Sequence, residues 1–111
     1  MATASPQEVQ AVKAALDQDP LNAGVGILHE PTGRIYLKPF DQVPGGHAQL
    51  AGDLGLPLSE CKGFGIAKAA GGAYVPVNNS HLNGPQGLPG SLQMPQPTFA
   101  DIVRALQAAG L

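Results

Sequence analysis

The chain carries little charge, and this limits the partners it can recognise. Only 13% of its 111 residues are charged, about half of the roughly 25% found in ordinary globular chains. Six Lys and Arg against eight Asp and Glu give a net charge of −2. Nucleic acids and anionic membranes are bound largely by neutralising their phosphates. A nucleic-acid partner is therefore disfavoured.

Cysteine is also scarce, since Cys61 is the only one. A single cysteine excludes an intrachain disulfide and leaves any redox role of Cys61 open. A zinc site would need histidine and carboxylate ligands. The candidates are His29, His47, His81, Asp41 and Glu30. Their spacing matches no zinc motif, so we predict neither a metal nor a cofactor.

Long apolar runs are missing as well. No run reaches the roughly 18 apolar residues that a membrane-spanning helix needs. Residues 1–10 lack the basic and apolar regions of a signal peptide. We therefore expect a soluble chain with no membrane contact, cytoplasmic by default, with export by a dedicated effector system as the alternative.

Glycine and proline are abundant, at 15 and 11 residues. Disordered chains combine low hydrophobicity with high net charge, whereas this chain is 43% hydrophobic with clear apolar periodicity. Its length suits one hydrophobic core. We predict a single domain over residues 1–111 in which ordered loops join short elements.

Three helices are expected from capping signals and apolar spacing. Ser5 and Glu8 have the spacing of a capping box, which predicts a helix from there to residue 19. Thr98 and Asp101 repeat this spacing at the start of a last helix. Residues 47–54 carry apolar side chains at helical intervals and are followed by glycine. Each pattern predicts a helix of two or more turns.

Two hairpins are expected between these helices, from residues 24–30 with 34–40 and from 63–69 with 73–77. Pro76 suggests that the last strand lies at a sheet edge or ends there. The order is α-β-β-α-β-β-α, with an antiparallel sheet of about four strands. Three amphipathic helices suffice to cover one face of it or both edges, which makes the fold class α+β.

Gly45, Gly46 and His47 form the first candidate site, at the start of the middle helix. Free backbone N–H groups at a helix start can hold an anion or a small ligand. The alternative is that the glycines only turn the chain into the helix and that His47 packs on its apolar stripe.

The second candidate site is the polar run 78–83, which directly follows the last strand. Its possible binding residues are Asn78, Asn79 and Asn83. If His47 and His81 met, they could divide general-acid and general-base roles, and Ser80 could act as a nucleophile. The alternative is that these side chains bond only their own backbone. No diagnostic catalytic motif accompanies them, which leaves open whether the protein is an enzyme.

Residues 69–100 contain no charged side chain and are rich in proline and glycine. Such a surface is typical of the centre of a protein interface. It predicts a contact surface containing Leu88, Leu92 and Met94, with a protein partner or a second copy of the chain.

Several short segments resemble predicted C-terminal domains of bacterial polymorphic toxins and related secreted effectors. They are Gly33-Arg34-Ile35, residues 44–51, Gly63-Phe64, Ser80-His81-Leu82-Asn83 and residues 102–106. The resemblance implies a toxin, often a nuclease or another hydrolase, with His47 and His81 in candidate active-site segments. The chain departs from that pattern by beginning with its own Met and by lacking the basic balance of nucleases.

These observations leave two principal hypotheses. The favoured one is a small protein-interaction domain, in a bacterial effector setting, that uses residues 69–100. The alternative is a toxin-like hydrolase with ribonuclease-type acid–base chemistry on two histidines.

Overall fold

The computed structural model describes residues 2–78 and 94–111. Three α-helices and four strands follow in the predicted order: α1 (Pro6–Gln18), β1 (Gly24–His29), β2 (Arg34–Pro39), α2 (Gly46–Leu54), β3 (Cys61–Lys68), β4 (Tyr74–Val77) and α3 (Gln96–Ala108). Short 3-10 turns, η1 (Phe40–Gln42) and η2 (Leu58–Glu60), precede α2 and β3. The described strands form one sheet in the order β2-β1-β3-β4, with each neighbouring pair antiparallel. The predicted α+β class is confirmed.

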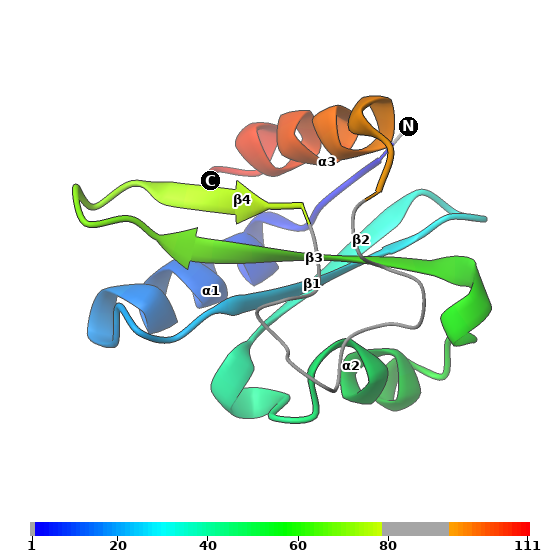
Figure 1. The fold of residues 1–111 in the computed structure, drawn as a ribbon, viewed down its shortest axis with the longest axis horizontal. Coiled ribbons are helices and arrows are strands. Elements are labelled where there is room, and N and C mark those ends of the chain that lie inside the picture. Colours follow the sequence, from blue (N-terminus) through cyan, green and yellow to red (C-terminus); the bar gives the residue numbers. More distant parts are fainter. Residues whose placement is uncertain (1, 79–93) are drawn as a thin grey trace.

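Helices lie on both faces of the sheet, not on one face or at its two edges as the sequence suggested (Figure 1). Successive side chains of a strand point to opposite faces. In β1, Leu28 points to the face covered by α1 and α3, while Val25 and Ile27 point to the face covered by α2. Because β1 places apolar side chains on both faces of the sheet, each face has a core of its own.

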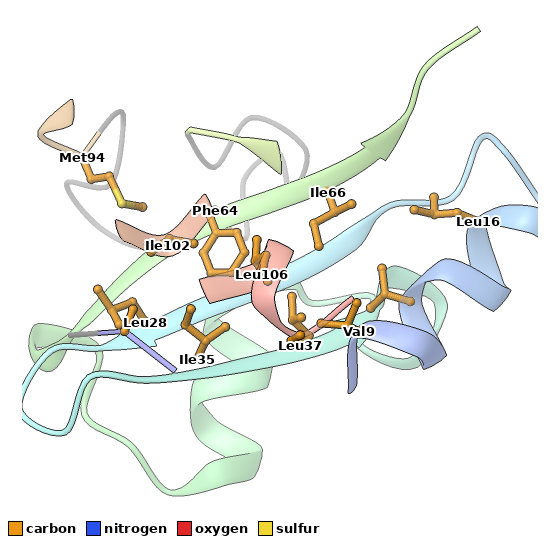
Figure 2. Packing of buried hydrophobic residues seen from close by; sticks show 13 residues of the cluster. Val9, Leu16, Leu28, Ile35, Leu37, Phe64, Ile66, Met94, Ile102 and Leu106 are labelled. Carbon is orange, nitrogen blue, oxygen red and sulfur yellow. The ribbon is translucent and has the colours of Figure 1, made fainter. Parts of the chain in front are cut away.

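The larger core lies between the sheet, α1 and α3, and Figure 2 shows its packing. Its labelled members are Val9, Leu16, Leu28, Ile35, Leu37, Phe64, Ile66, Met94, Ile102 and Leu106. Phe64 is fully buried, and its ring occupies the space that a Cβ at Gly26 would need. Gly26 therefore leaves the space into which the largest side chain of this core packs.

The outer edge of β2 is covered by the chain ahead of α1. The N–H of Thr3 donates to the Gly33 carbonyl at 2.9 Å, and the N–H of Ile35 donates to the Thr3 carbonyl at 2.8 Å. The next outward amide, that of Leu37, donates to Oε2 of Glu8 at 3.1 Å. With these groups satisfied, this edge offers little to an added strand.

The outer edge of β4 is blunted by Pro76, as predicted from the sequence. The N–H of Ala69 donates to the Ala73 carbonyl, and antiparallel bonding alternates along the pair. The backbone of Tyr74 and Pro76 therefore faces outward. Proline has no N–H to donate, and β4 is only four residues long. Short length and proline both oppose strand addition.

The predicted capping boxes are not formed, although both helices are present. The Ser5 hydroxyl donates to Oε1 of Gln7 at 2.9 Å, and the Glu8 carboxylate binds β2 instead of its own helix start. The last helix begins at Gln96, two residues before Thr98. Its Asp101 accepts the Ala2 N–H at 2.7 Å through Oδ2. Both carboxylates bind backbone donors far away in the sequence, which capping rules do not consider.

The middle helix ends as predicted. Gly55 has a left-handed φ of 72°, and the N–H of Leu56 donates to the Ala51 carbonyl at 2.9 Å. Glycine adopts this conformation without a Cβ penalty. None of the helices in residues 2–78 and 94–111 is long and apolar enough to cross a bilayer.

Candidate functional site

His47 lies in the first turn of α2 with its imidazole packed against β3. The side chain is fully buried. Its ring lies over Gly63, where a Cβ would come within 2.7 Å of Nδ1 and Cε1. Nε2 donates to the carbonyl of Phe64 at 2.8 Å. Burial lowers the pKa of His47 below its ordinary value of 6.5, and the bond to Phe64 offsets part of that effect. The ring is therefore neutral at pH 7.

The two glycines ahead of His47 serve the turn into α2. Gly46 has a φ of 74°, a region that side chains disfavour. Its N–H donates to the Val43 carbonyl at 2.8 Å. The N–H of Gly45 donates to Oε1 of Gln49 at 2.7 Å. Since both amides are used within the chain, an anion at this helix start could take neither without breaking a bond.

Asn78 joins the end of β4 to the segment that leads into α3. Its Nδ2 donates to the Met94 carbonyl at 3.0 Å, and its Oδ1 accepts the Met94 N–H at 3.0 Å. Met94 is buried in the larger core, so its side chain is not part of an exposed contact surface as the sequence suggested. These two bonds therefore link the end of β4 to the end of the segment that leads into α3.

Replacing Asn78 with alanine should lower the free energy of unfolding by about 1–2 kcal/mol, because two partly buried backbone groups lose their partner. Chemical denaturation followed by circular dichroism measures this. Asn78→Asp keeps the acceptor and loses the donor, and it turns a carboxylate oxygen toward the Met94 carbonyl, so it should not restore wild-type stability. An alanine variant as stable as wild type would show that the paired amide does not hold these ends.

The other residues of the polar run and of the predicted contact surface lie outside the described residues. They are Asn79, Ser80, His81, Asn83, Leu88 and Leu92. The pairing of His47 with His81, the nucleophilic role of Ser80 and the leucine surface therefore stay predictions.

Tyr74 anchors β4 to α1 through a cluster that the sequence did not indicate. Its hydroxyl donates to Oδ1 of Asp17 at 2.5 Å, and Nζ of Lys68 donates to the same oxygen at 2.7 Å. Nζ of Lys13 and of Lys68 lie 5.1 and 5.6 Å from the centre of the Tyr74 ring. The bonds from Lys68 and then Tyr74 lower the pKa of Asp17. The cluster fixes the β3–β4 hairpin on the helix.

A shallow, mostly apolar groove runs between residues 2–6 and α3. Its two parts have volumes of about 310 and 380 Å³. They share the side chains of Ala2, Ala105 and Ala108.

Among residues 2–78 and 94–111, no three His, Cys, Asp or Glu side chains are grouped so as to hold a metal ion.

His29 is the functional candidate that the sequence indicates least clearly. The sequence leaves it as a possible zinc ligand, a third acid–base candidate or a strand-end side chain that faces solvent or a neighbour, and the structure buries it between Thr32 and Glu60. Strand alternation predicts the face on which it lies, together with Val25 and Ile27. Its contact with Glu60 depends on the pairing of β1 with β3, which local patterns do not reveal.

Cys61 lies opposite His29 in the β1–β3 pairing. The thiol is buried, and its Sγ lies 3.4 Å from the Pro57 carbonyl. Burial, followed by the charges of Glu60 and Glu30, raises the pKa of the thiol. This environment disfavours the reactive thiolate.

No protein-family model matches this chain, and no curated protein or solved structure shows significant similarity to it.

Proposed function

We propose that this protein is an interaction domain whose contact surface is formed by the charge-free stretch 69–100. Within the described part of that stretch, the surface is the face of β4 that carries Val75. The observation that carries the proposal is Val75, whose exposed fraction is 42%. Val75 pairs with Ala67, and Val77 pairs with Gly65. On this face of β3 and β4 these four residues offer apolar or no side chain and no charge. A contiguous, uncharged apolar face on a rigid element is typical of a binding surface.

Rigidity supports the same proposal. Tyr74 points to the opposite face from Val75 and is fixed by Asp17 and the two lysines. The far end of β4 is fixed by the bonds between Asn78 and Met94. A surface that is already ordered loses less conformational entropy on binding. The hairpin is therefore suited to present Val75 to a partner.

We propose a second copy of this chain as the occupant. The surface has no charge, so two copies can bring it together without like-charge repulsion. Both sheet edges are blocked, β2 by Thr3 and Glu8 and β4 by Pro76. The contact should accordingly be made by side chains of the β4 face, not by extension of the sheet.

Val75→Asp should weaken self-association at least about tenfold, because it places a charge at the centre of an apolar contact. Sedimentation velocity over about a hundredfold range of protein concentration measures this. Leu21→Asp is the matched control, since Leu21 is apolar, 95% exposed and outside the stretch. Two results would refute the proposal: a monomer at every concentration, or equal weakening by Leu21→Asp.

The hydrolase alternative has one argument in its favour, because burial lowers the pKa of His47 and so favours its neutral imidazole. A neutral ring can accept a proton, but this one is buried and donates to Phe64. The test is cleavage of RNA by the wild-type chain. Cleavage that is lost in His81→Ala, with the melting temperature unchanged, would replace the interaction proposal.

A further inference from the structure

Near the turn between β1 and β2, the Thr32 hydroxyl and the Glu60 carboxylate of η2 contact the two ring nitrogens of His29. Nδ1 of His29 is 2.9 Å from Oγ1 of Thr32, and Nε2 is 2.8 Å from Oε1 of Glu60. His29 is buried, whereas Thr32 is exposed. An accessible hydroxyl therefore contacts a shielded imidazole whose other nitrogen is held by a carboxylate.

The carboxylate fixes the direction of these bonds when the ring is neutral. An ionised carboxylate only accepts hydrogen bonds, so the proton of the neutral ring lies on Nε2, facing Glu60. Nδ1 is then an acceptor, and the Thr32 hydroxyl donates to it. The other acceptor near this hydroxyl, the His29 carbonyl, is more distant at 3.4 Å. A hydroxyl that donates to a base oriented by a third group is the arrangement of an activated nucleophile.

We propose that the Thr32 hydroxyl is a nucleophile toward activated acyl donors, esters or thioesters, with His29 as its general base and Glu60 as a positioning residue. Oγ1 forms a bond to the acyl carbon while Nδ1 of His29 takes the hydroxyl proton. The bond from that carbon to the alcohol or thiol leaving group then breaks, and the leaving group departs with its electron pair. Thr32 becomes an acyl ester, and the ring becomes an imidazolium beside the Glu60 carboxylate.

Two neighbouring features suit this chemistry. The N–H of Arg34 donates to Oγ1 at 3.3 Å, so it helps to fix the position of the hydroxyl oxygen while the hydroxyl proton faces Nδ1. Gly33, with a φ of 72°, follows Thr32 without a side chain that would obstruct an approaching acyl group. The proposal is independent of the interaction surface on β4. It uses the last residue of β1, the turn after it and Glu60, and none of residues 69–100.

The experiment incubates the full chain with p-nitrophenyl acetate at about pH 8. Tandem mass spectrometry compares acetylation of Thr32 with that of Thr3, another exposed threonine. Thr32 should be acetylated at least about tenfold faster than Thr3, since a positioned base contributes rate factors of this size or more. Thr32→Ser should keep the acetylation at this position.

Two variants test whether His29 and Glu60 activate the Thr32 hydroxyl or only stabilise the β1–β2 hairpin. His29→Gln and Glu60→Gln leave the hydroxyl in place, and both should lower Thr32 acetylation toward the Thr3 level. Imidazole ¹⁵N shifts should report an Nε2-protonated neutral ring in wild type and a weaker tautomer preference in Glu60→Gln. Equal acetylation of Thr32 and Thr3 in wild type would overturn the proposal. Undiminished Thr32 acetylation in a folded His29→Gln variant would do the same.

Discussion

Gly26→Ala should lower the free energy of unfolding by about 2–3 kcal/mol, although it adds a single methyl group. The new Cβ would lie within 2.7 Å of Cε1 of Phe64 and would overlap other atoms of the same ring. Phe64 is fully buried in one core with Ile102 and Leu106. Because close-packed interiors have few voids, the ring cannot move away without displacing these neighbours. Urea denaturation followed by far-ultraviolet circular dichroism measures the loss.

Gly52→Ala is the matched control, since it adds the same methyl group to α2 with no atom within 4 Å. It should stabilise the protein by about 0.5–1 kcal/mol, because alanine favours the helix over glycine. A second arm combines Gly26→Ala with Phe64→Leu. If the ring is the obstacle, Gly26→Ala should cost less in that background. An equal cost in both backgrounds would assign the effect to the backbone of β1.

Elements that depend on local signals could be predicted from the sequence. The middle helix was recognisable because its apolar spacing is followed by glycine, and Gly55 does adopt the left-handed conformation. Both hairpins were recognisable from strand-like runs around short turns. Pro76 marked an edge strand for a chemical reason, its missing N–H. These signals lie within a few residues of the feature that they determine.

Contacts across the fold could not be predicted in this way. Glu8 and Asp101 looked like helix caps, but each binds a backbone N–H that only tertiary structure brings near, from Leu37 and Ala2. The lack of charge in its segment predicted that Met94 belongs to an exposed contact surface, yet its side chain enters the core. Local rules describe what a side chain can bind, whereas the strand order decides which partner is present.

The candidate sites follow the same division. The sequence left two interpretations of Gly45 and Gly46 open, a ligand site at the helix start or a turn into the helix. In the structure, the backbone N–H groups of both glycines donate hydrogen bonds within the chain. The bond from His47 to Phe64 and the contact of His29 with Glu60 required knowing that β3 lies beside β1. A histidine on an apolar strand face was the only available signal for the second.

Stability should fall as the pH drops below about 6.5, because His47 is buried as a neutral ring. Burial lowers its pKa in the folded state below the ordinary value of 6.5. Between these two pKa values the unfolded chain binds more protons than the folded one, so the free energy of unfolding decreases with falling pH. The full slope is about 1.4 kcal/mol per pH unit. The effect is absent well above pH 6.5 and stops growing below the folded pKa.

His47→Gln should remove this dependence, since glutamine does not titrate, and should also cost about 1–3 kcal/mol at pH 7 through imperfect packing over Gly63. Urea denaturation at a series of pH values gives both quantities. Gly52→Ala serves as the reference, because it should displace the whole curve without changing its slope. If His47→Gln kept the wild-type slope just below about pH 6.5, the acid sensitivity would belong to other groups. If it lost the slope, the decrease in stability just below pH 6.5 would be assigned to protonation of the His47 imidazole between α2 and β3.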